Sequence, residues 1–161
     1  MSRPSAEFEF RPPDDLAMVL DHMARLRTVH RGWLNLQPGI LEEDAPPQAS
    51  GITFLFAASV HDVPVCTWVA GHVDRHGEVQ PDSLGVQHAA GARVVARLDE
   101  LGLALPPGWR WVQDHPRRGL VVVTPPGTPA DEQLRWLTGI GAALSTVPLT
   151  GDWMASVYEG R

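Results

Sequence analysis

Short stretches in which polar and apolar residues alternate, or in which apolar residues run together, predict the strands of this chain. Glu7-Phe8-Glu9-Phe10 alternates as a half-buried strand does. Further stretches of strand length are 33–36, 52–60, 64–70, 109–115, 120–124 and 153–158. Because only a short polar link separates 52–60 from 64–70, and 109–115 from 120–124, each of these two pairs is expected to form a hairpin.

Apolar residues spaced three or four positions apart predict three helices. The first follows Pro12-Pro13, with Asp14 as its N-cap, and the last starts at Thr128-Pro129. The middle helix is expected to follow the turn-like stretch 71–83 and to end before Gly102. The side chains expected in the core are Leu20, Met23, Phe54, Phe56, Trp68, Val95, Leu98, Val122, Leu137 and Ile140.

The order of these elements predicts the fold class. From 64 to 158 they spell βαββαβ, the order of the ferredoxin-like α+β sandwich, in which an antiparallel sheet carries helices on one face. We therefore expect one domain over residues 1–161, with this sandwich over 64–158. Residues 1–60 would add an N-terminal βαβ unit and an extra strand, with the longest loop at 37–50. The fold hosts many unrelated functions, so the expectation concerns architecture.

Composition narrows the possible partners and chemistry. The 161 residues carry 13 basic and 19 acidic side chains, a net charge of −6, so a nucleic-acid binder is not expected. All the basic residues are arginine, which excludes Schiff-base and P-loop lysines and is typical of the coding bias of a high-GC bacterium. Cys66 is the only cysteine and lies in an apolar run, so we expect a buried thiol and no disulfide.

The same features predict a location. The N-terminus has no apolar core of signal-peptide length, and no stretch approaches the length that spans a bilayer. Together with the lone cysteine, this favours a soluble protein of the reducing cytoplasm, with no membrane contact. The sequence has no phosphate-binding or dinucleotide-binding glycine loop, no GxSxG and no HExxH motif, so no cofactor is expected.

One cluster has the composition of a metal site. The stretch 72–78 places His72, Asp74, His76 and Glu78 at every second position. In an extended strand the four side chains would share one face, and imidazoles with carboxylates are ligands for first-row metals. Asp74-Arg75-His76-Gly77 also has the composition of a tight turn, which would destroy the common face. We therefore expect a solvated hairpin tip with no bound metal, and keep the four residues as the metal candidates.

A second cluster lies at the predicted tip of the 109–124 hairpin. Asp114 and His115 are the catalytic candidates, because a carboxylate can orient an imidazole as a general base. Neighbouring strand residues point to opposite faces, however, so Asp114 is better placed to pair with an arginine across the turn. Arg117 and Arg118 are candidates for binding an anionic ligand or a partner. Trp111 joins them because tryptophan is enriched at binding hot spots.

These observations favour a non-catalytic binding or interaction domain that acts through a protein partner or by self-association, for example as a dimer. The alternative is a small enzyme or ligand-binding protein with a pocket near His72, His76, Asp114 and His115. The two hypotheses differ in whether these four residues converge in one concave pocket.

Overall fold

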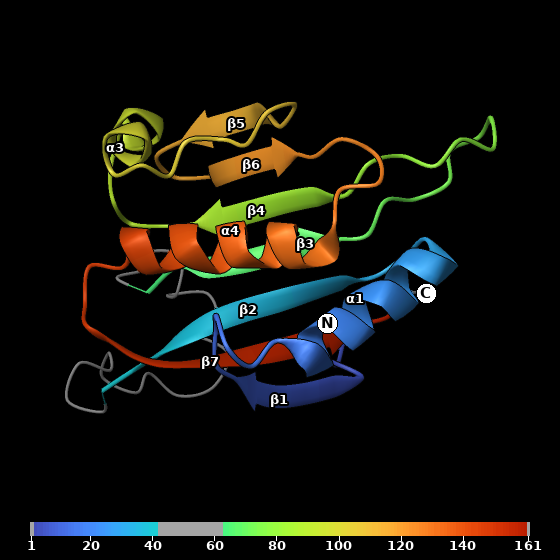
Figure 1. Ribbon diagram of the computed structural model, residues 1–161, viewed down its shortest axis with the longest axis horizontal. Helices are drawn as coiled ribbons and strands as arrows, with labels where there is room; N and C mark the ends of the chain where they lie inside the picture. The colour runs from blue at the N-terminus through green and yellow to red at the C-terminus, as the bar shows by residue number, and fades with distance from the viewer. Residues whose placement is uncertain (1, 42–62, 161) are drawn as a thin grey trace.

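Residues 2–41 and 63–160 are described by the computed structural model. They form a mixed α+β structure (Figure 1). In chain order the elements are β1 (Ala6–Phe10), α1 (Ala17–Val29), β2 (Trp33–Ile40), β3 (Val65–Val69), β4 (Ser83–Gln87), α3 (Val94–Glu100), β5 (Arg110–His115), β6 (Gly119–Val123), α4 (Ala130–Leu144) and β7 (Leu149–Tyr158).

The strands form one seven-stranded sheet in the order β1-β7-β2-β3-β4-β6-β5. Every neighbouring pair is antiparallel. The last strand therefore returns to the N-terminal part of the sheet and lies between β1 and β2. In the described part of the chain, β1 and β5 are the two edge strands.

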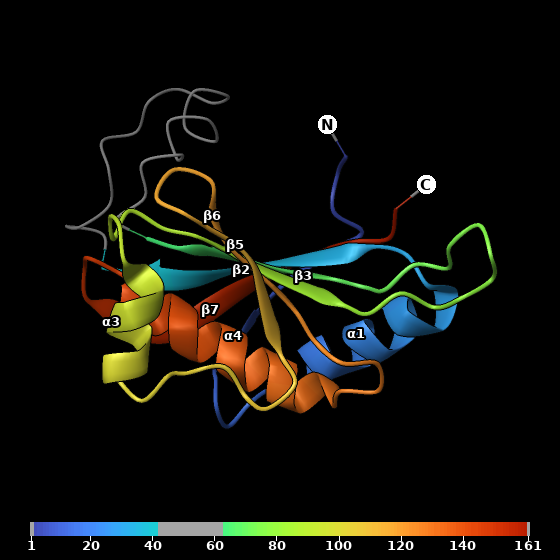
Figure 2. The ribbon, with the colours of Figure 1, turned by 90° about the horizontal axis from the view of Figure 1, so that it is seen from above.

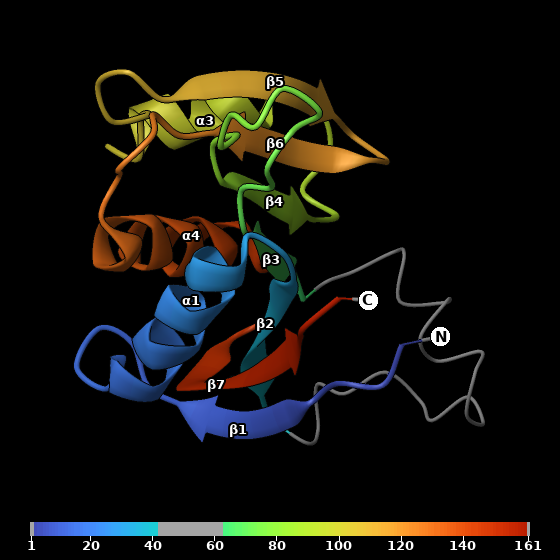
Figure 3. The same cartoon turned by 90° about the vertical axis from the view of Figure 1, so that its right-hand side faces the viewer.

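The helices cover a single face of this sheet (Figure 2). On that face α1 and α4 lie side by side, while α3 lies near β5 and β6 (Figure 3). Strand residues alternate between the covered face and the opposite one, and the covered set is buried. This core contains Phe10, Leu34, Leu36, Cys66, Trp68, Leu84, Val86, Leu120, Val122, Trp153, Ala155 and Val157 from the strands, and Val19, Met23, Leu26, Leu98, Leu134, Leu137, Ile140 and Leu144 from the helices.

A glycine allows α4 to approach the sheet closely. A Cβ at Gly141 would lie 2.6 Å from Cys66 Sγ and 2.8 Å from Trp153 Cη2. These distances are shorter than van der Waals contact, so a larger residue would push α4 away from β3 and β7. A Cβ at Gly139, on the same helix, would meet no atom of the described residues within 4 Å, apart from its chain neighbours and the backbone of its own helix.

The ferredoxin-like topology is not confirmed, because the strand order is not the ferredoxin-like one. The prediction missed β4, which occupies the part of the chain where the middle helix was expected to begin. Leu84 and Val86 are buried on one face while Ser83, Gly85 and Gln87 alternate with them, which is the period of a strand. The middle helix is correspondingly short, Val94–Glu100.

Several individual elements lie where they were predicted. The 109–124 hairpin and the last helix are present, and so is the strand expected at 7–10. Asp14 is not the N-cap of α1, because the chain makes a turn over 11–15 and the helix starts after Leu16. Of the predicted core, Leu20 and Val95 are half-buried, whereas Phe54 and Phe56, with the strand at 52–60, lie outside the described residues. No helix in the described ranges has the length and apolar character needed to cross a bilayer.

Candidate functional site

The four metal candidates lie in the connection between β3 and β4, where the chain makes a turn. Gly77 has φ +80°, and its N–H donates to Asp74 O at 3.0 Å. Asp74 Oδ1 accepts the N–H of Glu78 at 3.0 Å and of His76 at 2.8 Å, and these hydrogen bonds hold the pKa of this carboxyl below its usual value. Asp74 thus stabilises the turn, while His72, His76 and Glu78 are exposed. Within residues 2–41 and 63–160, no three His, Cys, Asp or Glu side chains are grouped to hold a metal ion.

At the tip of the β5–β6 hairpin, His115 closes the turn. Its Nδ1 accepts the backbone N–H of Arg117 and of Arg118, each at 3.1 Å. Both arginine side chains are exposed. The register of β5 shifts between Trp111 and Gln113, which puts Asp114 opposite Leu120 and His115 opposite Gly119. Asp114 forms none of the ion pairs found between described residues, so the expected pair with an arginine across the turn is absent there.

The sheet keeps these two clusters apart. The connection that carries His72 and His76 leaves β3 after Val69, and Val69 is paired with Ser83. Asp114 and His115 lie level with the other end of β4, beside the start of β6, because Asp114 pairs with Leu120 and Leu120 with Val86. Figure 1 shows the two connections at opposite ends of the sheet. The four residues therefore do not converge in one pocket.

Trp111 lies on the helix-covered side of the hairpin. It is half-buried, and its ring centroid is 5.9 Å from that of Trp136 on α4. Trp109 packs edge-on against the same ring at 5.3 Å. The three rings join β5 to α4, so Trp111 contributes to internal packing.

Two buried titratable groups lie elsewhere in the core. Complete burial raises the pKa of the Cys66 thiol to about 12, so a thiolate does not form at neutral pH. His88, just after β4, is 6% exposed, and burial lowers its pKa from the usual 6.5. Its Nδ1 accepts the N–H of Ala90 at 3.2 Å, whereas its Nε2 is buried and has no hydrogen-bond partner among the described residues.

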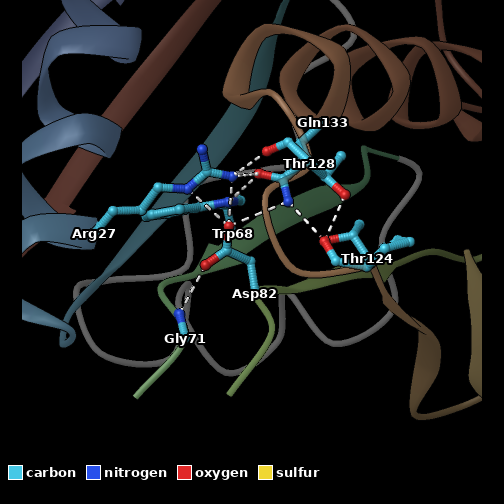
Figure 4. Close-up of polar contacts among 8 residues, drawn as sticks. Arg27, Trp68, Gly71, Asp82, Thr124, Thr128 and Gln133 are labelled. Atoms are coloured by element: carbon cyan, nitrogen blue, oxygen red, sulfur yellow. Dashed lines mark hydrogen bonds and ion pairs between the residues drawn. The ribbon is translucent and has the colours of Figure 1, made fainter. Parts of the chain in front are cut away.

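A polar network that the sequence analysis did not predict joins α1, β4 and α4 (Figure 4). Arg27 donates from Nε at 2.9 Å and from Nη2 at 2.6 Å to Asp82 Oδ2. The same Nη2 lies 2.8 Å from Gln133 Oε1 and 2.7 Å from the Thr128 carbonyl oxygen. Asp82 Oδ1 accepts the N–H of Gly71 at 2.8 Å. The Asp82 side chain is 11% exposed and the Arg27 side chain 31%, so this ion pair is largely shielded from water.

Gln133 extends the network into the core. It is fully buried, its Oε1 accepts the indole N–H of Trp68 at 2.9 Å, and its Nε2 donates to Thr124 Oγ1 at 2.7 Å. Nε2 also lies 3.2 Å from Asp82 Oδ2. A glutamine at a buried position of an otherwise apolar helix face is the sequence signal that could have located this network, because such a group needs partners.

The network borders a cavity of about 210 Å³ at the C-terminal end of α1. Its walls come from α1, from both arms of the β3–β4 connection and from the β6–α4 turn. They comprise Arg27, His30, Gly71, Val79, Gln80, Pro81, Asp82, Pro125, Pro126 and Gly127. None of the site residues predicted from the sequence lies in this cavity.

The second surface feature is the outer face of the sheet, opposite the helices. Strand register brings Tyr158, Trp33 and Val69 side by side across β7, β2 and β3. Trp33 and Tyr158 stack with centroids 4.9 Å apart and planes within 7°. We call these three residues the aromatic row. The next row along the strands, here called the small row, contains Ser156, Asn35, Thr67 and Gly85.

Comparisons with known proteins do not assign this chain to a family. No family model, no curated protein and no solved structure matches this chain.

Proposed function

We propose that this chain is a non-catalytic binding domain that acts through the outer face of its sheet, and that the partner is a second copy of the chain. The observation that carries the proposal is the aromatic row on a face that no helix of the described residues covers (Figure 2). Val69 is 39% exposed, and Met154, further along β7, is 40% exposed. Tryptophan and tyrosine are the residues most often found at binding hot spots.

The distribution of charge supports a protein interface on this face. The outward residues at the paired positions of β7, β2, β3, β4 and β6 are uncharged. This holds for the aromatic row, for the small row and for the positions that continue them across the sheet. Charged outward residues appear at the edge strands, as Glu7 and Glu9 on β1 and Arg110 on β5, and outside the two rows as Asp152 in the first half of β7. An uncharged centre with aromatic residues and a charged rim is the usual anatomy of a protein interface.

The two adjacent rows support a second copy as the partner. Two-fold symmetry pairs a surface with itself, so each feature needs its complement on the same face. An axis between the rows would seat the Trp33 and Tyr158 rings of one copy against Ser156, Asn35 and Thr67 of the other. Because the rows are uncharged, the net charge of −6 does not place like charges against each other at the centre of this contact.

The residues examined for catalysis support a non-catalytic role. His115 and Asp74 accept backbone hydrogen bonds in turns, and the Cys66 thiol is buried with a raised pKa. We retain the cytoplasm as the proposed location, on the ground that a lone cysteine forms no internal disulfide.

Sedimentation velocity tests the proposal. From micromolar to near-millimolar concentration, the weight-average mass of the wild-type chain should rise from 17.6 kDa toward that of a dimer. Trp33→Ser should weaken association about 30-fold, since a hot-spot tryptophan contributes about 2 kcal/mol. Thr67→Arg should also weaken it, because it inserts a charge into the small row without removing apolar surface.

Met18→Ser is the matched control, because Met18 is 54% exposed on α1, on the other side of the molecule. It should associate like the wild-type chain. A wild-type chain that stays monomeric over the whole range would overturn self-association, and equal association of Trp33→Ser and wild type would overturn the assignment to this face. A monomer that needs Trp33 to bind a different protein would replace the second copy with that protein.

A further inference from the structure

Arg27, which lines the cavity at the end of α1, has one guanidinium nitrogen that the described parts of the chain leave without a hydrogen-bond partner. Arg27 donates four hydrogen bonds, all from Nε and Nη2. Its Nη1 donates to no group in the described parts of the chain, and Arg27 is one of the residues that line the cavity. The bonds on Nε and Nη2 fix the plane of the guanidinium, so the free Nη1 edge is held in place before any ligand arrives.

The carboxylate that lines this cavity is already committed. Asp82 Oδ1 accepts from Gly71, and its Oδ2 accepts from Arg27 and from Gln133. The side-chain amide nitrogen of Gln80 donates to the Asp74 carboxylate. Three of the lining residues are prolines, which carry no N–H. Among the charged and titratable side chains that line the cavity, Arg27 Nη1 and the imidazole of His30 therefore have no hydrogen-bond partner in the described parts of the chain, against walls that are otherwise largely apolar.

From these features we infer that the cavity binds a small carboxylic acid in its ionised form. One carboxylate oxygen accepts from Arg27 Nη1, and the other faces His30. A single negative charge suits the site, because Asp82 lies in the same cavity and would repel a doubly charged phosphate more strongly. The volume of about 210 Å³ is below the range of pockets for drug-sized ligands, so the acid carries a short apolar group, which contacts the proline walls.

Glycine is required where the wall of this cavity is tightest. A Cβ at Gly71 would collide with the carbonyl oxygen of Gln80. The two arms of the β3–β4 connection therefore come together directly beside Asp82, which keeps the Gly71 N–H within reach of Oδ1. This close approach shapes the cavity independently of the sheet face proposed above as the contact surface.

Titration with propionate, followed by 1H–15N correlation spectra of the full chain, tests this inference. Propionate should cause saturable shifts of the Gly71 and Gly127 amides and of the Trp68 indole N–H, which shares Gln133 Oε1 with Arg27. Propionamide has the same size without the charge and should cause none. Arg27→Gln should lose the response, although it also removes part of the network and can unfold the chain.

If Arg27→Gln unfolds the chain, Val79→Phe tests the same cavity. Val79 lines the cavity and is 54% exposed, so a phenylalanine can cover the opening without touching the network, and the propionate shifts should disappear. Val73→Phe is the matched control, because Val73 pairs with Val79 in the same connection but does not line the cavity. Equal shifts with propionamide, tighter binding of inorganic phosphate, or unchanged propionate binding by Val79→Phe would each overturn the assignment.

Discussion

Replacing Asp82 by asparagine should destabilise the folded chain strongly, although the two side chains have the same shape. Asp82 Oδ2 receives N–H groups from Arg27 and from Gln133, and Oδ1 receives that of Gly71. An asparagine amide in either orientation turns one of these oxygens into a donor that faces another donor. Breaking one side of a buried ion pair costs about 3–5 kcal/mol, and because Arg27 is 31% exposed we expect about 3 kcal/mol here.

Asp152→Asn is the matched control. Asp152 pairs with Arg11 at 2.9 Å, but the side chains are 55% and 58% exposed, so its loss should cost no more than about 1 kcal/mol. Urea unfolding followed by tryptophan fluorescence measures both differences, and a loss of about 3 kcal/mol corresponds to a drop in Tm of about 6–12 °C for a chain of this size. Joint replacement by Arg27→Met and Asp82→Leu should recover much of the loss, since it leaves no unpaired charge. An Asp82→Asn variant as stable as Asp152→Asn would refute the role given to the network.

Three further outcomes follow from the packing and the titratable groups. Gly141→Ala should lower the free energy of unfolding by about 1–3 kcal/mol through overpacking. Gly139→Ala, two residues away in open space, should raise it by about 0.5–1 kcal/mol. Changes of the same sign for both variants in thermal unfolding would contradict the packing of α4. The Cys66 thiol, with its pKa raised to about 12 by burial, should react with a thiol reagent only as fast as the chain unfolds, and rapid labelling under native conditions would contradict its burial. Burial lowers the pKa of His88, so the unfolded chain binds more protons, and the free energy of unfolding should fall as pH drops below about 6.5. His88→Asn should flatten this pH dependence. An unchanged pH profile in this variant would show that His88 does not cause the dependence.

The period of the apolar residues predicted most of the individual elements. The helix at 130–144 and the hairpin at 110–123 were expected because their apolar positions repeat at a regular interval and turn residues bound them. The local pattern did not predict β4. Around Gly85 the alternation of buried and exposed residues is too short to distinguish a strand from the first turn of a helix. It also could not predict that β7 would insert between β1 and β2, since strand order depends on contacts far apart in sequence.

The partners in the polar network could not be predicted from the sequence for a related reason. Gln133 stands at a buried position of an apolar helix face, which signals that it needs partners. Arg27 and Asp82, however, lie more than fifty residues from it in sequence, and neither differs from an ordinary surface residue. The clusters that the sequence did single out, around His76 and His115, were recognised by local composition, and both occur in turns. Local composition identifies turns because turn hydrogen bonds are themselves local.

We propose that two copies of the chain contact each other through the outer sheet face, and isotope-filtered NOE spectra can observe this contact. A sample of equal parts labelled and unlabelled chain, at a concentration where sedimentation shows dimer, reports contacts between copies. We expect intermolecular NOEs from the Trp33 and Tyr158 rings to the methyl group of Thr67 and to Ser156. Intermolecular NOEs confined to the helices or to the β1 and β5 edges would contradict it.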